Sequence, residues 1–143
     1  MSKLSETLEE LISFNNLTVK SFAENIGIAA STVSNYLHGA RTPSIENIIK
    51  IADYFNCSVD HLLGLESENP TLTFKKCPPF PEQLDFLMKK FNRKPIDVDK
   101  SDTVSKSNYF EWKKGKRQPS LDNVIGLAQF FDCRIDFVLG REK

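Results

Sequence analysis

"LTVKSFAENIGIAASTVSNYLHGARTPSIENIIKIADYFNCSVDHLLG", residues 17–64, is the stretch of this chain that decides its fold. It contains hydroxyl residues of the kind that cap helix N-termini, together with glycines, which accept the positive φ that closes a helix. In chain order these residues are Thr18, Gly27, Gly39, Ser44, Ser58 and Gly64. The stretch therefore predicts four short helices, which begin after Thr18, at about residue 29, after Ser44 and after Ser58.

Apolar residues recur at helical spacing within each predicted helix, so each helix has one buried face. The expected inner positions are Phe22, Ala23, Ile26, Val33, Tyr36, Leu37, Ile45, Ile48, Ile49, Ala52 and Phe55. Upstream, Leu4, Leu8, Leu11 and Ile12 have the same spacing and predict a further helix that runs to about Phe14. Residues 1–65 are thus expected to form an all-α domain of five helices.

The same pattern stands a second time in the chain. "GARTPS" at residues 39–44 is followed 76 positions later by "GKRQPS" at residues 115–120. Without a gap, the same offset places Leu8 on Leu84, Asn47 on Asn123 and Gly64 on Gly140. A register kept over the whole unit is the mark of a duplicated folding unit. We therefore expect two tandem domains, 1–65 and 80–143, joined by a linker, 66–79.

Two short helices joined by a turn that contains glycine make up a helix-turn-helix. The quoted stretch resembles the phage-repressor and Cro type of helix-turn-helix, the xenobiotic-response-element family, over nearly all of residues 1–65. The features that carry the resemblance are Leu17 with Thr18, Ala23, the turn at Gly27, "STVSNYLHG" and "RTPSIENIIKIA". The implied fold is a pair of lambda-repressor-like helix-turn-helix domains, of which the second is divergent.

The resemblance implies that the third helix lies in the major groove of double-stranded DNA. By position, the residues that would face base edges are Ala30, Ser31, Thr32 and Asn35. Those near phosphates would be Lys20, His38 and Arg41, which set register but not sequence preference. Surface exposure or capping of the first helical turn is the alternative role for the hydroxyl and amide side chains.

The second domain keeps the helical frame better than the reading helices. At five inward positions around the second helix, Leu17, Phe22, Ala23, Ile26 and Ile28 are replaced by Arg93, Val98, Asp99, Asp102 and Val104. Burying an unpaired aspartate at the Ala23 position would cost several kcal/mol. We therefore expect this segment to have shifted, frayed or become irregular, with Thr103 in place of the turn glycine.

Charge divides the chain in two. Residues 1–66 hold 4 Lys and Arg against 8 Asp and Glu, a net of −4, whereas residues 67–143 hold 15 against 11, a net of +4. Much of the positive charge falls on and after the second domain's third helix, a position typical of phosphate contact. The DNA-binding residues expected in this domain are Lys106, Ser107, Asn108, Lys114, Lys116 and Arg117. A solvated lysine-rich loop is the alternative.

These patterns favour a repressor-like, sequence-specific transcriptional regulator that acts by operator occupancy. Its expected partners are double-stranded DNA and either a second chain, in a homodimer, or its own second domain, in an intrachain pseudo-dimer. The alternative function is a protein-interaction module such as an antitoxin or antirepressor. The third helix of the first domain favours this alternative, since it carries no Lys or Arg between Ala29 and Leu37.

Other classes of function have little support in the sequence. No nucleophile or phosphate-binding glycine loop accompanies Asp60 and His61, so we expect no enzyme. Three cysteines and two histidines without a CxxC motif predict neither a metal nor a cofactor. Cys57 and Cys133 are expected to be buried, which leaves Cys77 as the more reactive thiol. No apolar run suits a membrane, and without a signal peptide the chain is expected to be cytoplasmic.

Overall fold

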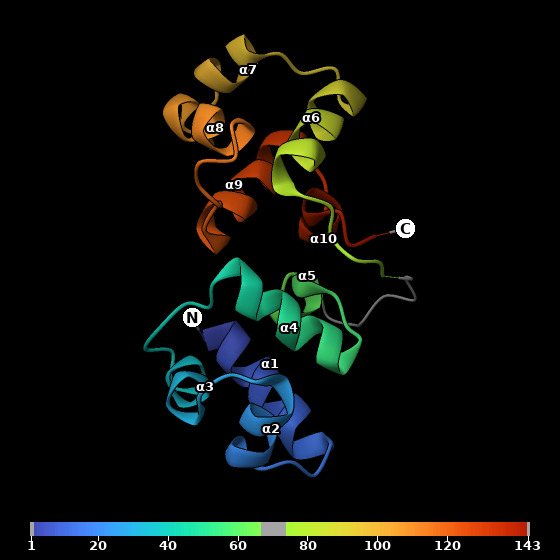
Figure 1. Cartoon of the computed structure of the whole chain (residues 1–143). Coiled ribbons are helices and arrows are strands. Elements are labelled where there is room, and N and C mark those ends of the chain that lie inside the picture. The colour runs from blue at the N-terminus through green and yellow to red at the C-terminus, as the bar shows by residue number, and fades with distance from the viewer. Residues whose placement is uncertain (1, 67–73, 143) are drawn as a thin grey trace. The chain divides into compact units, whose positions relative to one another are not determined.

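The computed structural model describes residues 2–66 and 74–142, and the chain divides into two compact units, Met1–Thr71 and Leu72–Lys143. In the described residues the regular structure is helical, which confirms the all-α prediction (Figure 1). The single extended pairing found there is an isolated antiparallel bridge between Phe74 and Glu142. Among the described helices, none has the length and apolar character that crossing a bilayer requires.

The first unit contains the helices α1 (Ser2–Phe14), α2 (Val19–Ile26), α3 (Ala30–Leu37), α4 (Ile45–Phe55) and α5 (Val59–Leu62). The predicted caps are confirmed. The Thr18 hydroxyl accepts from the Ser21 amide at 3.0 Å, and the Ser44 hydroxyl accepts from the Asn47 amide at 3.1 Å. Gly27 closes α2 at φ 71°. These local contacts satisfy backbone groups that helix ends leave without intrahelical partners.

The buried apolar residues of the first unit come from all five helices. They include Leu4, Leu8, Ile12, Phe22, Ala23, Val33, Tyr36, Ile48, Ile51, Ala52, Val59 and Leu62. The inner face of α4 differs from the prediction, because Ile51 is buried while Ile45, Ile49 and Phe55 are half-buried. The buried stripe of α4 is therefore rotated toward Ile51.

The second unit contains the helices α6 (Phe80–Lys90), α7 (Pro95–Lys100), α8 (Lys106–Lys113), α9 (Leu121–Phe131) and α10 (Ile135–Leu139). The bounds of α8 and α9 are those of α3 and α4 shifted by 76 positions. Left-handed residues pair at the same offset: Asn16 with Asn92, Gly39 with Gly115, Asn56 with Asp132 and Gly64 with Gly140. From α2 and α7 onward the two units thus share helix starts, and they share the left-handed turns except the one after α2.

The helix α7 begins in this register but ends early and is followed by an irregular turn, as its polar substitutions predict. This helix has six residues whereas α2 has eight, and Asp99 is exposed rather than buried. After α7, the Ser101 hydroxyl donates to the Val98 carbonyl at 2.9 Å and holds a non-helical turn. The Thr103 carbonyl then approaches α9 so closely that a Cβ on Gly126 would lie 2.4 Å from its oxygen. The turn of the second unit is therefore rebuilt against α9.

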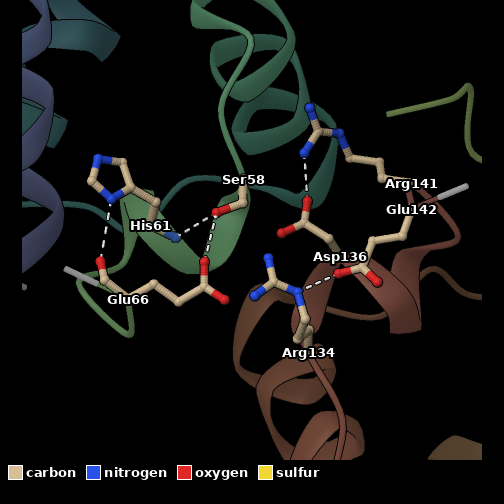
Figure 2. Close-up of polar contacts among 7 residues, drawn as sticks. All are labelled: Ser58, His61, Glu66, Arg134, Asp136, Arg141 and Glu142. Atoms are coloured by element: carbon tan, nitrogen blue, oxygen red, sulfur yellow. Dashed lines mark hydrogen bonds and ion pairs between the residues drawn. The ribbon is translucent and has the colours of Figure 1, made fainter. Parts of the chain in front are cut away.

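Polar contacts close the last helix of each unit (Figure 2). In the first unit, the Ser58 hydroxyl donates to a Glu66 carboxylate oxygen at 3.2 Å, and His61 Nδ1 lies 3.2 Å from the Glu66 carbonyl oxygen. In the second unit, at the positions 76 residues on, Arg134 forms an ion pair with Glu142. The contact between residues 58 and 66 of the first unit is thus a hydrogen bond, whereas the equivalent contact of the second unit, between residues 134 and 142, is an ion pair.

Arg141 forms a second ion pair and also links the two ends of the second unit. Arg141 is 1% exposed, pairs with the Asp136 carboxylate and lies 4.2 Å from the centroid of the Phe74 ring. The Lys75 amide donates to the Arg141 carbonyl at 2.7 Å. The sequence "TLTF", residues 71–74, suits a short extended strand; Thr71–Thr73 lie outside the described residues, and Phe74 pairs with Glu142 in the isolated bridge.

The cysteines follow the prediction in part. Cys57 is buried at 2% exposure. Cys133 and Cys77 are both half-buried, so the expectation of a buried Cys133 is wrong. Cys133 comes directly after Asp132, the residue that ends α9 in the left-handed conformation.

Candidate nucleic-acid interface

The N-terminal part of α3 presents a polar face in the first unit. Ala30 and Ser31 are exposed, and Thr32 and Asn35 are half-buried. Within the described residues, the side chains of Ser31, Thr32 and Asn35 form no hydrogen bond, so their polar groups remain available to a ligand. A hydroxyl or amide without an intramolecular partner on a helix face can bond to a base edge.

The opposite side of α3 is fixed by packing and by two hydrogen bonds. Val33 and Tyr36 are buried. The Asn47 side-chain amide, from α4, donates to the Tyr36 hydroxyl at 2.8 Å, and the Ser5 hydroxyl, from α1, donates to the Tyr36 carbonyl at 2.9 Å. A helix held from two sides presents its polar face in one orientation, which specific readout requires.

Sequence reasoning missed Ser5 and Asn47 as supports of α3. Asn47 carried a signal, since it is one of the residues that recurs 76 positions later, as Asn123. Ser5 carried none, because its partner lies 31 residues away and its counterpart is Pro81.

The residues predicted to lie near phosphates surround this face. Lys20 is exposed on α2, which packs against α3. His38 is exposed at the C-terminal end of α3, where its Nδ1 lies 3.4 Å from the Ser34 hydroxyl oxygen. Arg41 is exposed in the turn that follows. In the part of the chain that the structure describes, neither Lys20 nor Arg41 forms an ion pair, so both charges face solvent.

The second unit presents a more charged surface at the corresponding place. Lys106 and Ser107 are exposed at the start of α8, and Asn108 is half-buried. Lys106 lies 3.9 Å from the Asp99 carboxylate. The exposed cations Lys114, Lys116 and Arg117 follow α8 and have no ion-pair partner among residues 2–66 and 74–142. We call these three residues the basic turn.

Trp112 does not belong to this surface. It is 3% exposed, and its ring lies 6.2 Å from that of Phe80 in an edge-to-face contact. Trp112 stands 76 positions after Tyr36, which predicts a place in the core rather than on a surface that stacks on a base, and its burial confirms this place. No group of three or more potential metal ligands occurs in the described ranges.

Comparisons with known proteins agree with this geometry. A family model described as helix-turn-helix matches residues 15–62, which contain α2 to α5 and hence the polar face of α3. The HTH-type transcriptional regulator AnsR of Bacillus subtilis is 38% identical over 66 residues, which cover 46% of this chain and 57% of that protein. This chain therefore spans little more than half of AnsR.

Two further relatives are covered more fully. The cryptic phage CTXphi transcriptional repressor RstR of Vibrio cholerae is 33% identical over 87 residues, 58% of this chain and 74% of that protein. The uncharacterized HTH-type transcriptional regulator YobD of Bacillus subtilis is 28% identical over 95 residues, 66% of this chain and 85% of that protein. No solved structure matches the chain significantly.

Proposed function

This chain belongs to the helix-turn-helix family, and on that premise we propose that it is a sequence-specific DNA-binding transcriptional regulator that represses by occupying an operator. The observation that carries the proposal is the polar face of α3. The side chains of Ser31, Thr32 and Asn35 form no hydrogen bond within the described residues, although the helix that carries them is fixed through Tyr36. The relatives named as regulators or repressors support it.

In the proposed complex α3 enters the major groove. The Asn35 amide would form two hydrogen bonds to adenine, one with N6 and one with N7. The Ser31 and Thr32 hydroxyls would each either donate a hydrogen bond to a base edge or accept one from it. Ala30 leaves space for a thymine methyl. Lys20, His38 and Arg41 would contact phosphates and fix the register of α3 on the duplex.

We further propose that residues 1–65 and 80–143 are tandem copies of one domain, joined by 66–79. The shared helix bounds and the paired left-handed residues support the duplication. Helix-turn-helix repressors bind half-sites roughly 34 Å apart as dimers. The second copy would supply one half of such a pair, either within one chain or by pairing two chains. Its basic turn would add phosphate contacts.

The test is selection from a random duplex pool with the full chain and with the Asn35→Ala variant. We expect the full chain to enrich one motif, and the variant to lose about tenfold of its preference at one A·T pair, the effect of one bidentate contact. Asn15→Ala, which changes an exposed asparagine after α1, is the matched control and should keep the preference. If the Asn35→Ala variant selects the same motif as the wild type, Asn35 does not contact a base.

A second candidate function is a protein-interaction module such as an antitoxin or antirepressor. The specific observation in its favour is that α3, Ala30–Leu37, contains no Lys or Arg. The two functions differ in salt response, because DNA binding releases counterions and weakens steeply as salt rises. A full chain that enriches no duplex, but captures a protein partner with little salt dependence, would favour the second function.

A further inference from the structure

Glu111 is an acidic side chain on the helix that corresponds to α3. It lies on α8, is half-buried and stands 76 positions after Asn35. The buried residues of α8, Tyr109 and Trp112, stand in the same way 76 positions after the buried residues of α3, Val33 and Tyr36. Because side-chain direction on a helix follows position relative to the buried stripe, Glu111 has the same orientation on α8 as Asn35 has on α3.

The surroundings of Glu111 do not explain it as a structural residue. Its carboxylate forms no hydrogen bond or ion pair within the described ranges, although the same helix and the turn after it carry five exposed cations, Lys106, Lys113, Lys114, Lys116 and Arg117. A carboxylate on a surface that approaches phosphates weakens binding by repulsion unless it meets a donor. The donor that the major groove offers a carboxylate is the N4 amino group of cytosine.

We propose that Glu111 is a specificity-determining residue, which accepts a hydrogen bond from cytosine N4 in the major groove. This inference rests on the proposed function. At the base pair that corresponds to the Asn35 contact, the second unit would then select C·G where the first selects A·T. The operator is accordingly a composite of two unlike half-sites rather than a palindrome.

Lys106 extends the same difference between the units. It stands 76 positions after Ala30, which has no side-chain hydrogen-bonding group, and it is exposed at the start of α8. A lysine ammonium donates to the O6 and N7 acceptors of guanine. The reading face of α8 thus combines a donor for guanine and an acceptor for cytosine, whereas that of α3 is uncharged.

The experiment uses the full chain. A duplex motif is selected with the wild type, and the affinity for this duplex and for each single base-pair variant is then measured by fluorescence anisotropy. Glu111→Gln keeps the shape of the side chain and removes its charge. We expect it to lower the discrimination for C·G at one pair by about tenfold, while Glu111→Asn moves the preference at that pair to A·T.

Glu82→Gln is the matched control, since it removes one negative charge from an exposed position of α6. It should leave every base preference unchanged, whatever it does to overall affinity. Helix content measured by circular dichroism confirms that the variants are folded. Loss of preference with Glu111→Gln alone supports the inference.

Three results overturn this inference, and the last of them is distinguishable from the first two. If the wild type selects a motif but Glu111→Gln keeps every base preference, or if the selected motif is a perfect palindrome, Glu111 is not a base reader and the proposed function stands. If the wild type selects no duplex at all, the proposed function fails and the inference fails with it.

Discussion

One pair of equivalent asparagines forms different contacts in the two units. Asn47 donates to the Tyr36 hydroxyl at 2.8 Å, but the second unit has Trp112 in place of Tyr36. Because tryptophan has no hydroxyl at that place, Asn123 turns to the helix cap, where its Oδ1 accepts from the Ser120 amide at 3.1 Å. The first unit therefore fixes α3 with a part-buried hydrogen bond, and the second fixes α8 with an aromatic contact.

A single glycine decides how the second unit packs its turn. Gly126→Ala should lower the free energy of unfolding by about 1–3 kcal/mol, since the new Cβ would overlap the Thr103 carbonyl and force the turn to shift. Without this contact, the same change inside a helix would stabilise by about 0.5–1 kcal/mol. Urea denaturation of the full chain, monitored by circular dichroism, shows whether the substitution raises or lowers the free energy of unfolding.

The matched control is Lys50→Ala, at the equivalent position of α4, where the side chain is 42% exposed. Its expected effect is within about 0.5 kcal/mol, as is usual for exposed sites. A stabilising Gly126→Ala would show that the turn does not pack against α9 in solution.

At the scale of elements, α2 and α7 begin at equivalent positions with different caps. The Thr18 hydroxyl caps α2 and the Ser21 hydroxyl accepts from the Thr18 amide at 2.9 Å. At the start of α7, the Lys94 side chain provides no such bond, and the helix relies on Asp97, whose carboxylate accepts from the Lys94 amide at 2.7 Å. The shorter helix thus has the weaker N-terminus.

Removing the cap of α2 should therefore cost stability in the first unit alone. We expect Thr18→Ala to lower the free energy of unfolding by about 1 kcal/mol, because the Ser21 amide loses its acceptor. Lys94→Ala, the equivalent change at α7, should alter it by less than about 0.5 kcal/mol. Amide hydrogen exchange in α2 and α7 measures both effects, and equal loss of protection in the two helices would contradict the comparison.

The elements that sequence predicted well are those whose causes are local. Thr18, Gly27 and Ser44 each act within four residues, so their roles could be read from the chain itself. The inner face of α4 was predicted less well. Apolar residues fill most of that helix, and the neighbouring helices, rather than periodicity, select Ile51.

Contacts between distant residues were not predictable from the sequence. The Phe74–Glu142 bridge and the contact of Arg141 with the Phe74 ring depend on how the C-terminal end of the chain approaches Phe74. In the candidate interface, the exposure of Ser31 and the Lys106 surface follows from helix periodicity, but the support of α3 by Ser5 required the packed structure. The roles of these residues toward DNA stay predictions.

At the scale of the whole molecule, the two halves carry opposite net charge, −4 over residues 1–66 and +4 over residues 67–143. If both units contact DNA, most of the salt dependence originates in the second. Replacing Lys114, Lys116 and Arg117 by glutamine should weaken binding to all sequences alike. It should also reduce the slope of log affinity against log salt by about 2.7, at roughly 0.9 per phosphate contact.

The control for this variant replaces Lys75, Lys76 and Lys89 by glutamine, which removes the same charge from exposed positions outside α8 and its turn. Anisotropy titrations at several salt concentrations give both slopes. If the slopes of log affinity against log salt are equal for the two variants, the basic turn is ordinary solvated surface and does not contact phosphates.

The clip formed by Phe74, Lys75 and Arg141 brings the two ends of the second unit side by side. A domain whose ends lie close together can be inserted into a surface loop of a host protein without moving the two ends of that loop apart. The second unit is therefore suited to insertion into another protein, provided that the inserted segment starts before Phe74 and ends after Glu142. A graft that starts at Phe80 would leave Arg141 without its aromatic cover.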